Sequence, residues 1–163
     1  MPRFVLTFLG VAAVLFSIYW ATDASGHFGV VNKGNAALCN AVLHCFGIGG
    51  TRIGTQLTYR GGGMDIISEC SAVYVVILFA AGVLAFPTSW RARLRGLGLG
   101  IPLLLLINIL RLASLGVVLE HRAALLPLFH EYLWQVFFIL LTAFLYLQWI
   151  ERLVRREGSG STA

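Results

Sequence analysis

Hydrophobic residues fall into four long runs along the chain that carry almost no charge. The runs cover Phe4–Ala21, Cys70–Trp90, Gly96–Leu119 and Glu131–Ile150. A helix needs about 20 apolar residues to cross the hydrocarbon core of a bilayer. The pattern therefore predicts an all-α fold, a polytopic membrane helix bundle with about four transmembrane helices.

The first run has a second interpretation, as a cleaved signal peptide. Arg3 precedes it, and the small residues Ala21 and Ala24 follow it. The apolar region of a signal peptide usually has about 7–15 residues, and this run is longer. We therefore expect a helix that is retained in the protein.

The segment between the first two runs has patterns of its own. Asn35–Gly47 is apolar on much of its circumference but too short to span, which predicts an interfacial or re-entrant helix. Thr51–Tyr59 and Met64–Ile67 are strand-like and are separated by glycines at 61–63. We expect a small hairpin there, packed above the bundle.

Arginines beside the runs predict the orientation of the protein. They form three groups: Arg3 at the start, Arg91, Arg93 and Arg95 between the second and third runs, and Arg152, Arg155 and Arg156 after the fourth. Four spans bring all three groups to one side, which the positive-inside rule makes cytoplasmic. We expect a bacterial inner-membrane protein with a cytoplasmic C-terminus and with Thr22–Glu69 and Glu120–His130 on the outer side.

Composition supports this class of protein. Of 163 residues, 58% are hydrophobic and 12% are charged, and the mean hydropathy is +0.84. Soluble domains have about 25% charged residues. These values exclude a soluble enzyme, a disordered chain and a nucleic-acid-binding domain, and three cysteines, an odd count, do not form a disulfide framework. We expect one domain over residues 1–157 and a disordered Gly-Ser tail over 158–163.

The net charge of +5 raises the question of a nucleic-acid partner. The arginines border apolar runs, so contact with lipid headgroups explains them better. Membrane lipid is therefore the expected partner of the basic residues.

Arg111 is the one charge within the third run. A charged residue at the centre of a membrane helix costs about 2.5–3.5 kcal/mol on the insertion scale and usually marks a functional site. Asn108 and Ser114 lie three residues to either side and share its helical face. This polar stripe must face protein or trapped water. A purely structural pair with a buried ion or carbonyl group is the alternative.

The predicted topology brings two further reactive groups to the level of Arg111. Arg111 lies about 12 Å below the outer surface, at about 1.5 Å per residue. Cys70 begins the second run and His130 directly precedes the fourth, both at the same side. A thiol nucleophile needs a proton acceptor, which histidine supplies, and an arginine favours the thiolate and can stabilise an oxyanion. The three residues suit acyl transfer on a peptide bond.

Other interpretations stay open on the residues alone. A cysteine in an apolar helix is usually a packing residue, and a carboxylate at Glu69 opposes thiolate formation at Cys70. His121 also lies on the outer side, and periodicity does not choose between it and His130.

Cys39, His44 and Cys45 are a weak candidate for a metal site. Two cysteines six positions apart on a helix point in different directions, so neither a shared metal nor a disulfide is expected. The sequence predicts no cofactor and no bound metal.

The residues around the three candidate positions resemble a known family. MDIISECSAVY at 64–74, Asn108-Ile-Leu-Arg111 and Phe129-His130-Glu131 resemble the exosortase/archaeosortase family, whose members are integral membrane cysteine enzymes with a Cys, Arg, His triad on successive helices. The resemblance covers about residues 35–150. The chain is as short as the compact exosortase H type. It departs from the family at Ala72, where glycine is common.

The resemblance implies roles for the candidate residues and a partner. Cys70 would be the nucleophile, Arg111 the triad arginine and His130 the triad histidine. Clients would be exported proteins that end in a short motif, of the IPTL type for exosortase H, followed by an apolar helix and a basic cluster.

Two hypotheses about function follow. The first is a membrane-embedded thiol protease/transpeptidase that cleaves such a C-terminal sorting signal through a thioester on Cys70, at the outer face of the membrane. The second is a non-enzymatic transporter subunit or assembly scaffold, in which Arg111 is a buried structural residue.

Overall fold

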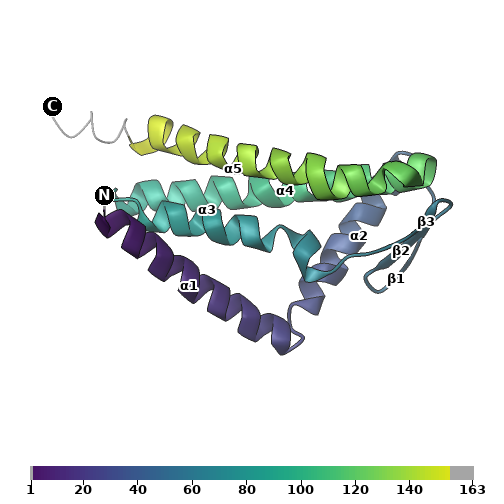
Figure 1. The fold of residues 1–163 in the computed structure, drawn as a ribbon, viewed down its shortest axis with the longest axis horizontal. Helices are drawn as coiled ribbons and strands as arrows, with labels where there is room; N and C mark the ends of the chain where they lie inside the picture. Colours follow the sequence, from purple (N-terminus) through teal and green to yellow (C-terminus); the bar gives the residue numbers. More distant parts are fainter. Residues whose placement is uncertain (1, 155–163) are drawn as a thin grey trace.

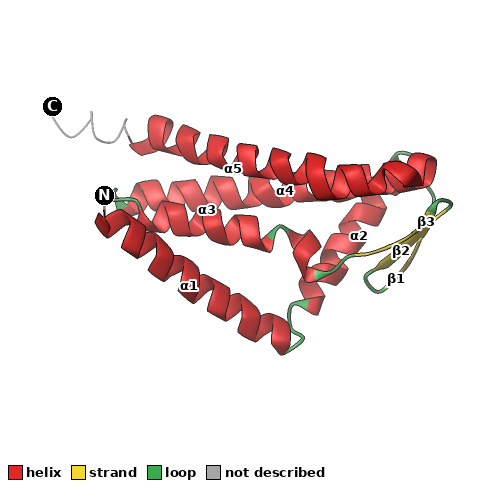
Figure 2. Cartoon of the chain, viewed as in Figure 1, coloured by secondary structure: helices red, strands yellow, loops and turns green. Residues whose placement is uncertain are grey.

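The protein is mainly helical, with one small sheet at one end (Figure 1 and Figure 2). This computed structural model describes residues 2–154, so the predicted tail over 158–163 and the predicted domain end at 157 lie outside the described residues. The helices are α1 Pro2–Ala24, α2 Gly29–Cys45, α3 Val73–Ala85, α4 Trp90–Arg122 and α5 Trp134–Trp149, and the strands are β1 Thr51–Ile53, β2 Gln56–Tyr59 and β3 Gly62–Asp65.

The helical membrane bundle is confirmed, but one predicted span is shorter than expected. By length and composition, three segments of the described chain can cross a membrane: Pro2–Ala24, Trp90–Leu125 and Leu128–Arg152. The second apolar run contains only α3, with 13 residues. At about 1.5 Å per residue α3 is about 20 Å long, shorter than a hydrocarbon core of about 30 Å. The prediction that Cys70–Trp90 forms one helix is therefore wrong.

The backbone at both ends of α3 explains its length. Ala72 has a left-handed conformation (φ 58°), which separates α3 from a 3-10 turn over Ser68–Ser71. At the other end, Phe86 is extended and precedes Pro87. The residue before a proline disfavours the α conformation, so α3 ends there.

The helices of the third and fourth runs also differ from the predicted ranges. The Ser89 hydroxyl accepts a hydrogen bond from the Ala92 amide at 3.2 Å and caps α4. The predicted spans leave Arg91, Arg93 and Arg95 in a short loop, and this prediction is wrong, because they lie in the first turns of α4. A π-helical turn over Leu128–Leu133 precedes α5, so the predicted start at Glu131 falls within that turn.

The short helix of the outer segment is α2, which starts before the predicted Asn35. It ends at Cys45, where Gly47 has a positive φ of 75°. The Gly47 amide donates to the His44 carbonyl and the Ile48 amide donates to the Leu43 carbonyl, both at 3.0 Å. This pair of bonds is a Schellman motif, in which glycine is favoured because it has no Cβ.

The predicted hairpin is a three-stranded antiparallel sheet in the order β1-β2-β3. The stretch Thr51–Tyr59 makes two strands, because Gly54 (φ 65°) turns the chain within it. The sheet is attached to the end of α4, where Glu120 accepts a hydrogen bond from the Arg60 amide at 2.8 Å. A Cβ at Gly61 would collide with the Leu119 carbonyl, so the turn between β2 and β3 needs glycine.

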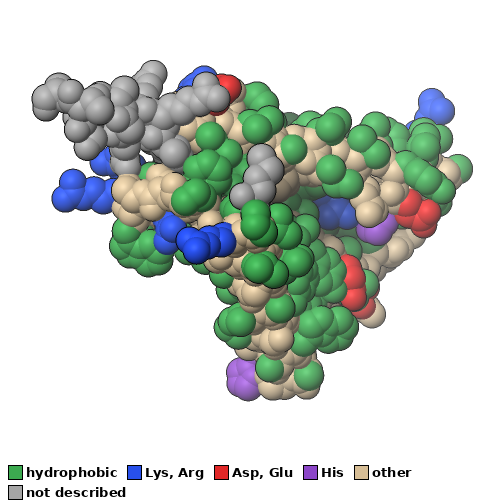
Figure 3. Space-filling view, turned by 60° about the vertical axis from the view of Figure 1, so that its left-hand side comes forward, with side chains coloured by type: hydrophobic (Ala, Val, Ile, Leu, Met, Phe, Trp, Pro, Cys, Tyr) green, Lys and Arg blue, Asp and Glu red, His purple; other side chains and the backbone are tan. Residues whose placement is uncertain are grey.

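The elements define two ends of the molecule. The start of α1, the α3–α4 connection and the end of α5 lie at one end, and α2, the sheet and the α4–α5 connection lie at the other (Figure 1). Two contacts confirm the first end: the rings of Phe4 and Phe86 are 6.2 Å apart, and the Trp149 indole donates to the Ala92 carbonyl at 2.9 Å. Basic side chains gather at this end on the face drawn in Figure 3. We call it the basic end and, after the sidedness that the sequence predicts, the opposite one the outer end.

Candidate active site

Cys70 lies in the 3-10 turn Ser68–Ser71 at the outer end, just before α3. Its amide donates to the Ile67 carbonyl at 2.9 Å. Its carbonyl accepts a hydrogen bond from the Asn108 side chain of α4, also at 2.9 Å. Asn108 is fully buried, so this bond has little competition from water. The backbone of Cys70 is thus attached directly to the helix that carries Arg111.

Two more helices hold the same turn through Ser68. The Ser68 hydroxyl donates to the Asp23 carboxylate at the end of α1, at 2.6 Å. It also accepts a hydrogen bond from the Asn32 amide of α2, at 3.1 Å. Bonds to a charged acceptor are among the stronger hydrogen bonds in proteins. The turn of Cys70 is therefore fixed by α1, α2 and α4 together.

Arg111 is half-buried in the middle of α4, on the polar face that the sequence predicted. Its Nη1 is 3.5 Å from Asn108 Oδ1, and its Cζ lies 5.7 Å from the centre of the Phe138 ring on α5. Its Nε is buried without a hydrogen-bond partner. Within residues 2–154, no acidic side chain forms an ion pair with Arg111. The guanidinium therefore keeps donor capacity for a further group.

His130 reaches the site from the π-helical turn before α5. The adjoining Trp134 donates its indole N–H to the Ser114 hydroxyl at 2.9 Å. That hydroxyl donates to the Arg111 carbonyl at 2.7 Å. This chain of bonds fixes the start of α5 against α4 at the level of Arg111. Single π turns are rare and frequently occur at functional sites.

Cys70, Arg111 and His130 line one cavity of about 390 Å³. We call it the Cys70 cavity; its other lining residues are Ile67, Glu69, Ala72, Tyr74, Val75, Glu131, Trp134, Gln135, Phe138 and Ile139. On the face drawn in Figure 3, a basic side chain, a histidine and acidic side chains meet in a hollow. A thiol, an imidazole and a guanidinium from three segments thus share one partly enclosed space.

The surroundings of Cys70 favour the neutral thiol at rest. Cys70 is 8% exposed, and this burial raises the pKa of its thiol. The Ile67 backbone contact and the Arg111 charge lower that pKa, whereas the Glu69 and Asp65 carboxylates raise it. Arg111 and Glu69 act in the predicted directions, but burial outweighs the arginine. The thiol therefore needs a proton acceptor in order to react.

Alkylation kinetics should report this balance of charges. Iodoacetamide reacts with the thiolate, so we expect the Cys70 rate to rise with pH up to an inflection above that of free cysteine, about 8.5. Arg111→Gln removes a cation that lowers the pKa, so the inflection should move to still higher pH. The measurement is the rate of Cys70 modification between pH 6 and about 11, followed by peptide mass spectrometry.

Arg60→Gln is the matched control for this experiment. It removes a cation from the outer end, where Arg60 contacts Glu120 outside the Cys70 cavity. Its alkylation curve should coincide with that of the wild type. An inflection below that of free cysteine, or one that Arg111→Gln leaves in place, would contradict the electrostatic account.

Ala72 gives a prediction about stability. Its φ of 58° costs a residue with a Cβ about 1–2 kcal/mol. Glycine removes this cost but also a buried methyl group, about 0.8 kcal/mol. Ala72→Gly should therefore be neutral or slightly stabilising, whereas the β-branched Ala72→Val should lower stability by about 1–3 kcal/mol.

Thermal unfolding in detergent measures the relative stabilities of the wild type, Ala72→Gly and Ala72→Val. The control is Ala13→Val, at an exposed position of α1, which should change stability by less than about 0.5 kcal/mol. Equal midpoints for Ala72→Val and Ala13→Val would show that the backbone at residue 72 is not strained.

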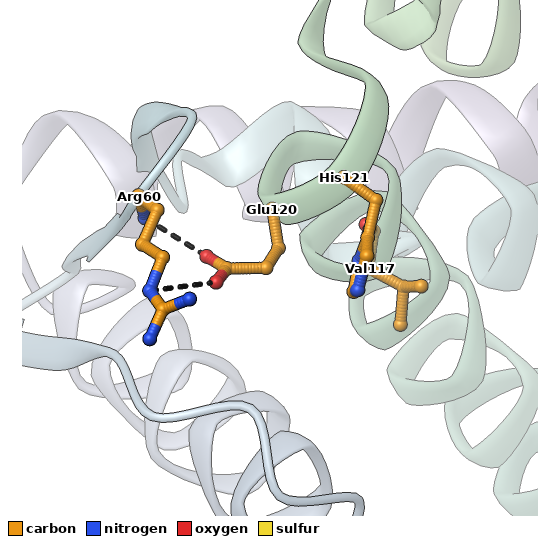
Figure 4. Close-up of polar contacts among 4 residues, drawn as sticks. All are labelled: Arg60, Val117, Glu120 and His121. Atoms are coloured by element: carbon orange, nitrogen blue, oxygen red, sulfur yellow. Dashed lines mark hydrogen bonds and ion pairs between the residues drawn. The ribbon is translucent and has the colours of Figure 1, made fainter.

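His121, the rival histidine, lies elsewhere. Its Nδ1 is 3.1 Å from the Val117 carbonyl of its own helix, and its neighbour Glu120 contacts Arg60 (Figure 4). His121 borders a separate cavity formed with residues 46–49 and Arg60. The structure thus brings His130, and not His121, to the cavity of Cys70.

The other two cysteines lie in α2 and apart from this cavity. Cys39 is fully buried, and burial raises the pKa of its thiol to about 12. Cys45 is exposed. All three cysteines are free thiols in the described chain. Cys39 is thus a packing residue of the outer end.

Several residues of this site have no signal in the sequence that marks them as functional. Asp23, Asn32 and Ser68 hold the Cys70 turn, although they lie far apart in the sequence. Trp134 and Gln135 line the cavity from a run that hydropathy marks only as apolar. The one available signal was the polar face of α4, which places Asn108 beside Arg111.

Comparison with known proteins identifies the family. The model of the family described as Transmembrane exosortase (Exosortase_EpsH) matches residues 2–147. No curated protein matches the chain, and no solved structure does. The matched range extends from α1 into α5 and contains Cys70, Arg111 and His130. It covers most of the 163 residues, and the predicted resemblance is confirmed: the chain belongs to the transmembrane exosortase family.

Proposed function

We propose that the protein is a membrane-embedded cysteine protease/transpeptidase that cleaves the C-terminal sorting signal of exported proteins. The observation that carries the proposal is the shared cavity of Cys70, Arg111 and His130. Family membership supports it, as does the absence of an ion pair on Arg111 within residues 2–154. A purely structural Arg111, as in the scaffold hypothesis, should have such a partner, because an unpaired buried charge is costly.

The first half of the reaction forms a thioester. His130 accepts the thiol proton of Cys70 as the sulfur attacks the scissile carbonyl. The oxygen gains negative charge in the tetrahedral intermediate, and the guanidinium of Arg111 stabilises it. The carbon–nitrogen bond then breaks, and His130 returns the proton to the leaving amine. The products are a thioester on Cys70 and the released C-terminal peptide.

The second half releases the client. Water or an amine attacks the thioester carbonyl and gives a proton to His130. The carbon–sulfur bond breaks, and the Cys70 thiolate recovers the proton. With water the client ends in a carboxylate, and with an amine it is joined to the acceptor through an amide. The same site therefore accommodates hydrolysis and transpeptidation.

The proposed setting is the bacterial inner membrane, with the Cys70 cavity on the periplasmic side. The basic end, which carries the first turns of α4, would face the cytoplasm according to the positive-inside rule. The C-terminus would lie there too, because α5 ends at the basic end. Clients would be exported proteins with a motif, an apolar helix and a basic cluster, the compact exosortase H type implying an IPTL-type motif.

Trapping of the thioester tests the proposal. The purified protein is incubated with a reporter that ends in Ile-Pro-Thr-Leu, an apolar helix of about 20 residues and an arginine cluster. We expect a covalent adduct on Cys70 that hydroxylamine releases as a client hydroxamate, detected by mass spectrometry. Reporters with other motifs control for the choice of client. Cleavage without any adduct on Cys70 would contradict the mechanism.

A further inference from the structure

A second cavity, of about 360 Å³, lies beside the Cys70 cavity and is almost entirely apolar. We call it the α3 groove. α3 forms its floor with Leu78 and Gly82, α1 forms one wall with Phe4 and Phe8, and α5 forms the other with Ala143 and Tyr146. α1 and α5 lie on either side of α3 (Figure 1). The face of α3 between the two longer helices is thus left open.

The groove and the Cys70 cavity are continuous. Val75 of α3 and Phe138 and Ile139 of α5 line both of them. From this junction the groove extends towards Phe4, whose ring contacts Phe86 near the basic end. An elongated apolar ligand in the groove would therefore lie along the bundle axis, with one end at Cys70.

The polar groups of the groove are already satisfied within the protein. The Thr142 hydroxyl donates to the Phe138 carbonyl at 2.7 Å, and the Tyr146 hydroxyl donates to the Gly82 carbonyl at 3.3 Å. Neither hydroxyl therefore has a donor left for a ligand. The groove thus suits aliphatic side chains, and Ala143 on its wall permits close approach of a helix.

We propose that the α3 groove binds the apolar helix of the client sorting signal, parallel to α3 and between α1 and α5. The inference rests on the proposed function and adds the surface that recognises the client. The order motif, helix, basic cluster matches the order Cys70 cavity, groove, basic end. A lipid chain would fill the groove without presenting a peptide bond to Cys70.

Site-specific photocrosslinking tests the position of the client helix. A benzoylphenylalanine replaces Leu78, 46% exposed in the groove, or Leu106, 58% exposed on α4 outside it. Both are placed in full-length Cys70→Ser protein in membranes that contain the Ile-Pro-Thr-Leu reporter. We expect an adduct with the reporter helix from position 78 and at least about tenfold less from position 106. Equal adducts, or lipid adducts alone at position 78, would overturn the proposal.

A groove-filling variant tests the consequence for catalysis. Ala143→Trp fills the groove, and Leu140→Trp places the same side chain at an exposed position of α5 that lines neither cavity. We expect Ala143→Trp to raise KM for the reporter about tenfold, a change worth about 1.4 kcal/mol, with its Cys70 alkylation rate unchanged. Leu140→Trp should leave KM unchanged. Equal KM values for both variants would overturn the proposal.

The proposed function and the proposed role of the α3 groove can be refuted independently of each other. Crosslinking measures proximity in a variant that lacks the thiol, so it does not depend on cleavage. A reporter that crosslinks at position 78 but is never cleaved by wild-type protein would contradict the proposed function alone. A reporter that is cleaved but crosslinks equally at both positions would contradict the groove alone.

Discussion

Cys70→Ala is expected to abolish cleavage of the sorting-signal reporter, by at least about 10⁴-fold. The sulfur is the attacking atom, and no other thiol lines the cavity. Cys70→Ser should be almost as inactive, because a serine hydroxyl is a far weaker nucleophile than a thiolate without a strong base. The measurement is the rate of reporter cleavage with purified protein in detergent or liposomes.

Matched controls exist within the chain for this variant. Cys45→Ser removes an exposed thiol of α2 and should keep wild-type activity. The bond from Asn108 goes to the Cys70 carbonyl and not to its side chain, so Cys70→Ala should retain the fold. Normal cleavage by Cys70→Ala would refute thioester catalysis and favour the hypothesis of a non-enzymatic scaffold.

His130→Ala is expected to lower the cleavage rate by about 10²–10⁴-fold, the usual contribution of a general acid–base. Burial raises the pKa of the Cys70 thiol, so without a proton acceptor little thiolate forms at neutral pH. The remaining activity of His130→Ala should increase as the pH rises and hydroxide deprotonates the thiol. The measurement is the pH–rate profile of reporter cleavage.

His121→Ala is the matched control, because both histidines lie at the outer end and only one lines the Cys70 cavity. We expect its activity to stay within about threefold of the wild type, because His121 does not line the Cys70 cavity. Most surface substitutions also change the free energy of unfolding by less than about 0.5 kcal/mol. An inactive His121→Ala together with an active His130→Ala would reverse the assignment of the proton carrier.

The candidate site was predictable where it depends on one-dimensional patterns. Arg111 stands out because a charge within an apolar helix is costly, and helical periodicity places Asn108 on its face. The common level of Cys70, Arg111 and His130 in the bundle could be predicted by counting the apolar runs between them. The choice of His130 over His121 was not available from periodicity, since both follow the third run.

The hydrogen bonds that hold the Cys70 turn could not be predicted from such patterns. Asp23, Ser68 and Asn32 come from three different segments, and their hydrogen bonds leave no periodic signal in the sequence. The prediction of one helix over Cys70–Trp90 failed because hydropathy does not detect a single left-handed residue such as Ala72. The three-stranded sheet was missed in part because Gly54 turns the chain inside an apparent strand.

The sequence by itself determined the class of the protein, because its apolar runs are long enough to cross a membrane and carry almost no charge. It also singled out Arg111 as a candidate residue, because a charge within such a run is costly. The tertiary structure alone decided that Cys70 lies in a turn held by three helices and that a groove leads to it along α3. Both features arise from contacts between distant segments, which depend on packing and not on local pattern.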